Sequence, residues 1–318
     1  MQNKKISIIV PVKNNEKEIA NSTKELVKVK NENNFKNFEI IFIDDLSDDS
    51  SWEKIIFQSL EYPNIVKGIK LGRNYGQQLA SYVGMKHALN SDYVITLDCD
   101  LEDDPNNIIK LINELIIKKS DCVLTISSFQ GPILYKFFSK IYYLVMGTWT
   151  NIKSGHRHTN LRIYSKPCVN SLMKLNPSFF NLTHSAAHIN AKIDYLMVNK
   201  FIKERVSSYT ITSKTKLAIS TLFDLSSFVN SIFIFLFLIA ILFIIFYYFY
   251  NIYIYIALGS LSGFFSLISF LTLIIFMIST SFIYLNHKLN SIIQFLYKGM
   301  DKKNFDDYFD ILEKVGFD

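Results

Sequence analysis

The sequence has little cysteine: only Cys99, Cys122 and Cys168 occur among 318 residues, and no Cys-x-x-Cys pair is present. So few thiols predict a reducing compartment and buried, unpaired cysteines. The sequence also has no recognisable nucleic-acid-binding motif, internal repeat or low-complexity linker. We do not expect a cleavable signal peptide, because the first apolar run, Ile6–Val12, is short and leads into charged residues.

Charge is absent from Leu225 to Asn286, where no Asp, Glu, Lys or Arg occurs. A single membrane span needs about 20 apolar residues, so this run accommodates two helices and a turn. The helices are expected near Phe228–Tyr250 and Ile254–Leu285, as a transmembrane hairpin within residues 226–286. The alternative is a buried helical hairpin of a soluble protein.

Basic residues flank this uncharged run, and the turn within it has none. By the positive-inside rule, the long parts before and after the hairpin lie in the cytoplasm, at an inner or plasma membrane. The net charge of +6 therefore indicates attraction to anionic lipid rather than to nucleic acid, which is not an expected partner. The flanking bases are Lys200, Lys203, Arg205, Lys214 and Lys216 before the run, and Lys288, Lys298, Lys302 and Lys303 after it.

Short β-rich runs alternate with segments of helical spacing over the first 125 residues. The helical segments include Glu16–Lys30 and Pro105–Lys118, the latter with Asp103 or Asp104 as its cap. This alternation predicts an α/β fold with a doubly wound, Rossmann-like, mostly parallel sheet. The β-rich runs are 5–12, 38–43, 65–71, 92–97 and 121–126, and "NLRIYS" at 160–165 predicts a further strand.

Polar loops follow four of these runs in succession. They read "PVKNNE", "DDLSDDS", "GRNYGQQ" and "DCDLEDD". Ligands of open α/β sheets bind beyond the carboxyl ends of the strands, so these loops predict a binding site.

Two segments have a less regular pattern. Residues 132–149 interleave aromatic residues with Lys136 and Lys140, which is typical of a helix at a membrane surface, although core packing is an equal alternative. The tail, Lys288–Asp318, alternates charged and aromatic residues and is expected to fold along the cytoplasmic face.

Asp98 and Asp100 are the main candidate metal ligands. In an extended chain their side chains lie on the opposite side from Cys99, hence close to each other. Two like charges so near repel, and a hard divalent cation removes that cost. Mg²⁺ or Mn²⁺ bound by one or two carboxylates and a diphosphate would neutralise charge on a departing phosphate.

The four loop motifs together resemble those of the family 2 glycosyltransferases, which have the GT-A fold. The segments that carry the resemblance are "ISIIVPVKNN", "EIIFIDDLSDDS", "LGRNYGQQLASYVGMKHA" and "VITLDCDLEDDPNNI". With two C-terminal spans added, the chain is similar to the polyprenyl-phosphate glycosyltransferases, the dolichyl-phosphate-mannose synthase-like branch. The resemblance is strong to about residue 118 and weaker from there to the spans.

The resemblance implies a nucleotide-sugar site at matching positions. Lys13 and Asn15 stand where the family has Tyr and Glu, and the "DDGS" loop is Asp44-Asp45-Leu46-Ser47, without its Gly. The family's "DADLQDPP" implies that Asp98, Asp100 and, in the Gln position, Glu102 are metal ligands. The residues expected to bind the nucleotide sugar are Pro11, Lys13, Asn15, Asp44, Asp45, Asn74, Asp98 and Cys99.

On the acceptor side, the family's "DFRL" strand resembles Asn160-Leu161-Arg162-Ile163, which keeps the Arg but not the Asp. The "GKSSYT" element resembles residues 207–210, preceded by Arg205. A lipid phosphate arrives already ionised and needs positioning more than deprotonation, so the Asp can be dispensed with. Asp100, Arg162 and Arg205 are therefore expected to be catalytic.

Four histidines are further candidates. His156 and His158 could supply a base or an additional ligand, and the alternative is that they are polar loop residues. His184 and His188 have the i, i+4 spacing that can bind a metal on a helix, but no third ligand is evident and helix packing is favoured.

These features predict an inverting, metal-dependent glycosyltransferase that moves one sugar from a nucleotide sugar to polyprenyl phosphate at the membrane. One alternative is a family 2 transferase acting on a sugar hydroxyl in cell-surface polysaccharide assembly; another is a non-catalytic nucleotide-sugar-binding membrane protein. A homo-oligomer is left open. The expected domains are the transferase domain (1–199), a basic juxtamembrane segment (200–225), the two spans (226–286) and a cytoplasmic tail (287–318).

Overall fold

The protein is described by a computed structural model. It describes residues 3–127, residues 157–198 except 176, 178–179 and 183, scattered positions between 239 and 292, and residues 309–317. The chain divides into two compact units. The first comprises Met1–Arg205 with Lys302–Asp318, and the second comprises Val206–Asp301.

In the second unit, the described positions are helical except for a bend at Gly259. Within the described part of the chain, no helix is both long and apolar enough to cross a membrane. Much of the predicted hairpin at 226–286 lies outside the described residues, so the hairpin stays a prediction.

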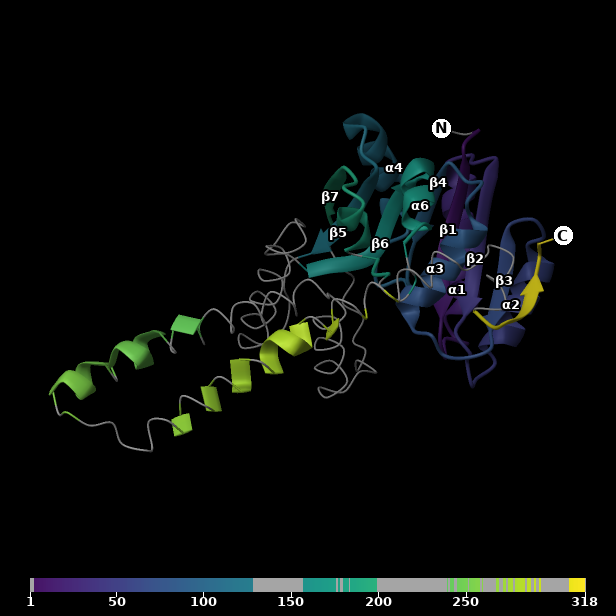
Figure 1. Ribbon diagram of the computed structural model, residues 1–318. Helices are drawn as coiled ribbons and strands as arrows, with labels where there is room; N and C mark the ends of the chain where they lie inside the picture. Colours follow the sequence, from purple (N-terminus) through teal and green to yellow (C-terminus); the bar gives the residue numbers. More distant parts are fainter. Residues whose placement is uncertain are drawn as a thin grey trace. The chain divides into compact units, whose positions relative to one another are not determined.

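The first unit is built around one mixed sheet of eight described strands, in the order β7-β5-β6-β4-β1-β2-β3-β8 (Figure 1). β1 pairs in parallel with β2 and β4, and β3 continues the parallel set beyond β2. β6 runs antiparallel to both β4 and β5, and β8 runs antiparallel to β3. The strands are β1 (Lys5–Val12), β2 (Asn37–Asp44), β3 (Val66–Leu71), β4 (Tyr93–Thr96), β5 (Cys122–Ser127), β6 (Arg157–Ser165), β7 (Ile193–Met197) and β8 (Ile311–Val315).

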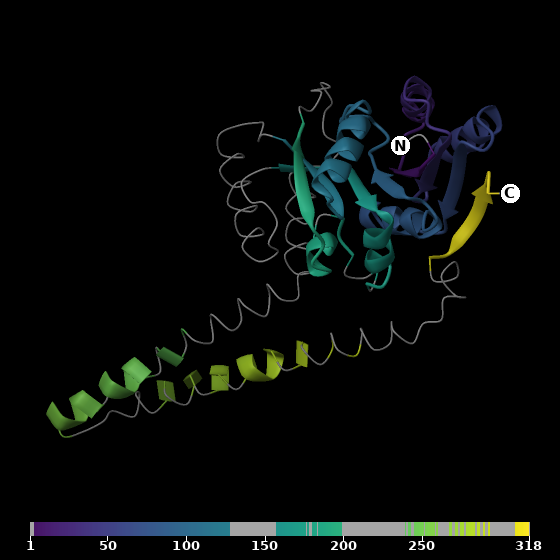
Figure 2. The same ribbon diagram turned by 90° about the horizontal axis from the view of Figure 1, so that it is seen from above.

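Helices cover both faces of the sheet (Figure 2). Helices α1 (Ile19–Glu32), α2 (Ser51–Glu61) and α4 (Asn107–Lys118) share one buried apolar cluster with the strand residues that face them. Helices α3 (Gln77–His87), α6 (Lys166–Leu172) and α7 (Ser185–His188) share the cluster on the opposite face. Consecutive strand residues alternate between the two clusters, as Ile8 and Ile9 do, because side chains alternate across a sheet.

The predicted strands are confirmed, with ends that differ by a few residues. Helix α4 begins at Asn107 rather than at Pro105, and Asp104 accepts a hydrogen bond from the Asn106 N–H (2.9 Å) instead of capping the helix at Pro105. The three cysteines are free and buried, as expected. Two edge strands were missed, β7 and β8, and β8 returns part of the predicted cytoplasmic tail to the sheet beside β3.

Glu39 is a buried charge that the sheet holds with three partners. The Ser7 hydroxyl donates to it, and the ammonium groups of Lys67 and Lys5 lie 2.9 and 3.2 Å from its oxygens. Burial raises the pKa of Glu39, but Ser7 and the two lysines outweigh burial, so the pKa is below its ordinary value. Its ionised form is therefore a net contributor to folding.

We expect Glu39→Gln to lower the free energy of unfolding by about 2 kcal/mol near pH 7, because a charged acceptor is lost. Since the folded pKa is depressed, this contribution is present above the unfolded pKa of about 4.3 and disappears as the pH falls through the folded value. Thermal unfolding of both proteins between pH 7 and pH 3 checks this, with the exposed Glu53→Gln as the control. A difference between Glu39→Gln and wild type that does not shrink as the pH falls from 7 to 3 would contradict it.

Candidate active site

The carboxyl ends of four neighbouring parallel strands bring the predicted polar loops to one edge of the sheet. The strands are β4, β1, β2 and β3, and their adjacency places the loops after residues 12, 44, 71 and 96 side by side. This is the edge at which α/β sheets bind ligands. The four predicted polar loops therefore lie at one edge of the sheet.

The loops after β1 and β2 are tied to each other by hydrogen bonds. The backbone N–H groups of Asn14 and Asn15 donate to the hydroxyls of Ser47 (3.0 Å) and Ser51 (2.9 Å). Lys13 donates to the Leu46 carbonyl and lies 3.2 Å from Asp48. Lys13 and Asn15, both expected to bind the nucleotide, therefore help to hold these two loops together.

Asp44 and Asp45 are both buried at this edge. Burial raises the pKa of each, against hydrogen bonds that act in the opposite direction. Asp45 accepts hydrogen bonds from the N–H groups of Tyr75 and Gly76, both 2.7 Å long. Asp45 thus fixes the loop that contains Asn74, where Gly76 has a φ of 85° that suits only glycine.

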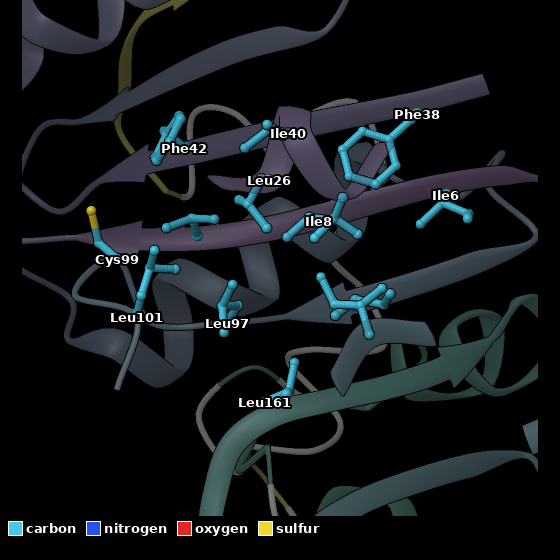
Figure 3. Packing of buried hydrophobic residues seen from close by; sticks show 14 of the residues in the cluster. Ile6, Ile8, Leu26, Phe38, Ile40, Phe42, Leu97, Cys99, Leu101 and Leu161 are labelled. Atoms are coloured by element: carbon cyan, nitrogen blue, oxygen red, sulfur yellow. The ribbon is translucent and has the colours of Figure 1, made fainter. Parts of the chain in front are cut away.

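After β4 the chain turns rather than staying extended as expected, because the Leu101 N–H donates to the Asp98 carbonyl (3.3 Å) and Leu101 has a φ of 54°. Leu97, Cys99 and Leu101 lie in the apolar cluster (Figure 3). Asp98 and Asp100 are half-buried. Burial raises the pKa of the Cys99 thiol far above its ordinary value. Of the predicted ligands, Asp98 and Asp100 therefore face the edge, whereas Cys99 could meet a nucleotide only through its backbone.

Two carboxamides hold the carboxylate of Asp98. Gln77, the first residue of α3, donates to Oδ1, and Nδ2 of Asn160 on β6 donates to Oδ2 over 2.8 Å. Asn160 lies beside Asp98 because β6 pairs with β4, where the Thr96 hydroxyl also donates to the Asn160 carbonyl (2.9 Å). Sequence reasoning missed Gln77, although it lies within the quoted "GRNYGQQ" loop.

Asp103, which was expected only as a candidate cap of the following helix, is buried in the loop after β4. It is 1% exposed, and neither of its carboxylate oxygens has a hydrogen-bond partner among the described residues. Strand alternation could not have placed it, because the chain turns between Asp98 and Leu101. A buried carboxylate without a partner is costly, and a cation is one remedy.

The residues of this loop fit a divalent cation. Asp98 and Asp100 could supply oxygen ligands at the edge, and both carboxylate oxygens of Asp103 in the same loop have no hydrogen-bond partner among the described residues. Asp100 Oδ1 accepts a hydrogen bond from the Glu102 N–H (3.2 Å). Within the described ranges no three His, Cys, Asp or Glu side chains are grouped to hold a metal, so Glu102 as a further ligand stays a prediction.

Arg162 is buried beneath the edge, at 2% exposure. Its Nε donates to the Thr159 carbonyl (2.9 Å), and its Nη2 donates to Oδ1 of Asn160 (3.3 Å). Asn160 therefore links the carboxylate of Asp98 to the guanidinium of Arg162. This link joins two residues that were assigned separately to the donor side and the acceptor side.

Several predicted elements lie outside the described residues. They are Arg205, residues 207–210, His156, the aromatic segment 132–149 and the juxtamembrane segment 200–225. Of the other histidines, His158 lies on β6, His184 precedes α7, and His188 ends that short helix.

Residues 7–173 match the family described as Glycosyl transferase family 2, which is more than half of the chain. The chain belongs to this family. It is 32% identical over 172 residues to an undecaprenyl-phosphate 4-deoxy-4-formamido-L-arabinose transferase of Salmonella choleraesuis, a match that covers 54% of this chain and 52% of that protein. The chain thus spans about half the length of the curated relatives it matches.

Solved structures share the fold at low sequence identity. The glucosyl-3-phosphoglycerate synthase of Mycobacterium tuberculosis, in complex with Mn²⁺, uridine diphosphate and glucosyl-3-phosphoglycerate, matches with a TM-score of 0.50 and 11% identity over 70% of this chain and 79% of that one. The mannosyl-3-phosphoglycerate synthase of Rubrobacter xylanophilus matches with a TM-score of 0.50 and 9% identity, covering 70% and 73%. The predicted GT-A fold is confirmed.

Proposed function

We propose that the protein is a membrane-anchored, inverting glycosyltransferase that moves a single sugar from a nucleotide sugar to polyprenyl phosphate. The observation that carries this proposal is the link from Asp98 through Asn160 to Arg162. An amide, which is not a base, occupies the position between the donor carboxylate and the acceptor-side cation. An acceptor that is already ionised suits such a site.

The reaction requires no proton to be removed from the acceptor. A phosphate monoester carries about 1.5 to 2 negative charges near neutral pH. Its oxygen attacks the anomeric carbon from the face opposite the leaving group, the bond from that carbon to the diphosphate oxygen breaks, and the nucleoside diphosphate leaves. A sugar hydroxyl would instead need a base tuned near the working pH.

On the donor side, Asp98 and Asp100 would hold Mg²⁺ or Mn²⁺, with Glu102 as an additional ligand. When bound, the cation neutralises negative charge on the departing diphosphate. Pro11 near the end of β1 and the loops that contain Lys13, Asn15 and Asn74 would bind the nucleotide, since Asp45 and the two serines hold these loops in place. The solved synthase that contains Mn²⁺ and uridine diphosphate supports this assignment.

The name of the curated relatives supports the lipid acceptor, because they are undecaprenyl-phosphate transferases. The uncharged run from Leu225 to Asn286 supports anchoring beside that lipid. Arg205 and the basic residues near it would then meet a phosphate at the head-group level, where anchoring raises the effective concentration of acceptor.

The proposal is tested by incubating purified protein in membranes with polyprenyl phosphate and a panel of labelled nucleotide sugars, with and without EDTA. We expect label in the lipid fraction that EDTA abolishes. Label only in a glycan would replace the proposal with transfer to a sugar hydroxyl. Nucleotide-sugar binding without turnover would identify a non-catalytic binding protein.

A further inference from the structure

His184 has a buried ring nitrogen without a hydrogen-bond partner. The side chain is 9% exposed, and no described residue pairs with Nδ1. The backbone around it is fixed, since the His184 N–H donates to the Asn181 carbonyl (3.1 Å) and the Leu182 N–H donates to Gln78 Oε1 on α3 (2.7 Å). A buried polar atom normally has a partner, so this nitrogen suits an atom supplied by a ligand.

The electrostatic surroundings of His184 favour its neutral form. His158, Arg162 and His188 act on it electrostatically, and together with burial, the largest cause, they lower the pKa of His184 to about 3. The imidazole is therefore neutral near pH 7 and has one N–H to donate. Buried positive charge at Arg162 disfavours a metal ion beside His184 and favours an anion.

The cluster reaches from the interior to the surface. Arg162 and His184 are buried, His158 is half-buried, and His188 is exposed one helical turn from His184. His188 is therefore the solvent-exposed member of the cluster. The same cluster touches the donor edge, because Asn160 bonds both Arg162 and Asp98.

The geometry points to a binding site for a phosphate monoester at His158, Arg162, His184 and His188, in which Nδ1–H of His184 donates to a phosphate oxygen. This inference rests on the proposed function, since the acceptor there is a lipid phosphate. Free phosphate has the same chemistry, so the test must separate the two. His184 binds the phosphate and does not act as a base.

Three variants of the full chain in detergent test the role of His184. His184→Leu removes the donor, His184→Asn places an amide N–H near the position of Nδ1, and His87→Leu changes a histidine of α3 outside the cluster. We expect His184→Leu to raise KM for polyprenyl phosphate about tenfold or more, because a hydrogen bond to a charged group is lost. KM for the nucleotide sugar should stay unchanged, and His184→Asn should restore most of the acceptor affinity.

Equilibrium binding of farnesyl phosphate and of inorganic phosphate gives a readout that is independent of turnover. Weaker farnesyl phosphate binding in His184→Leu, with little inorganic phosphate binding in any variant, supports a lipid phosphate site. Comparable binding of both ligands by wild type, weakened alike in His184→Leu, supports a general phosphate site. Wild-type affinity in His184→Leu, or no rescue by His184→Asn, would overturn the inference.

The failure of this inference and that of the proposed function are distinguishable. If wild-type protein labels lipid and His184→Leu keeps the wild-type KM, the function stands and the site is wrong. If wild-type protein labels no lipid, the proposed function fails, and the binding measurement still decides whether the cluster takes a phosphate monoester.

Discussion

Asp100→Asn is expected to reduce sugar transfer about 10³-fold while leaving the protein folded. Asn has the shape of Asp but lacks its charge, so the proposed divalent cation would lose one of its two carboxylate ligands at the edge of the sheet. Stabilisation of the leaving diphosphate amounts to several kcal/mol, and about 4 kcal/mol corresponds to this factor. Initial rates at saturating nucleotide sugar and Mn²⁺ measure the loss.

Asp104→Asn is the matched control for this change. Asp104 belongs to the same acidic loop, but its carboxylate accepts hydrogen bonds from Asn106 within the loop. We expect its rate to stay within about threefold of wild type, since substitutions away from such a site have small effects. Mn²⁺ binding should weaken in Asp100→Asn and not in Asp104→Asn; an Asp100→Asn enzyme with EDTA-sensitive turnover near the wild-type rate would refute the assignment of Asp100.

The central part of the fold follows from local sequence patterns. Apolar runs such as 5–12 and 38–43 form parallel strands that are buried on both faces, so their strongly apolar composition identifies them. β8 carries no such signal, because it is a short edge strand whose central residues are exposed. Its pairing with β3 joins segments more than 200 residues apart, which no local pattern can indicate.

The candidate site shows the same division between local and distant information. The partial exposure of Asp98 and Asp100 and the burial of Asp103 follow from a local turn between Asp98 and Leu101, which strand alternation does not predict. The contact of Asn160 with Asp98 depends on the antiparallel register of β6 on β4. No short sequence pattern encodes that register. From the sequence alone, Asn160 could therefore be identified only as a replacement of the family's Asp, and not as a hydrogen-bonded link to Arg162.

Gly84→Val is expected to destabilise the first unit by about 3 kcal/mol or more. A Cβ built at Gly84 of α3 would lie 2.3 Å from Cγ2 of Ile9 and 3.1 Å from Cγ1 of Ile43, both in the sheet. Such contacts force the helix away from the sheet, and overpacking a core costs about 1 to 3 kcal/mol or more. Thermal unfolding of the full chain in detergent checks the loss, which a wild-type midpoint would contradict.

A double-mutant cycle assigns this loss to the contact with Ile9. If Gly84 had no close neighbour, Gly84→Ala would stabilise the protein by about 0.5 to 1 kcal/mol through helix propensity. Any measured destabilisation by Gly84→Ala therefore reports the steric clash of the new Cβ. Ile9→Leu removes the β-branched methyl at modest cost. We expect Gly84→Ala to cost at least about 1 kcal/mol less in the Ile9→Leu background, whereas additive effects would exclude this contact.

The close packing at Gly84 also bears on catalysis, because α3 begins at Gln77, which donates to Asp98. A helix displaced from the sheet would move the Gln77 side chain. Of the two amides that donate to Asp98, only Asn160 would then remain in place. We therefore expect Gly84→Ala, assayed well below its unfolding midpoint, to lose about tenfold in kcat/KM, the cost of one hydrogen bond to a charged group. Ile9→Leu should recover part of this activity, and Gln77→Ala should lose a similar amount without lowering the midpoint as far. Full activity in folded Gly84→Ala would show that the position of α3 does not control the orientation of Asp98.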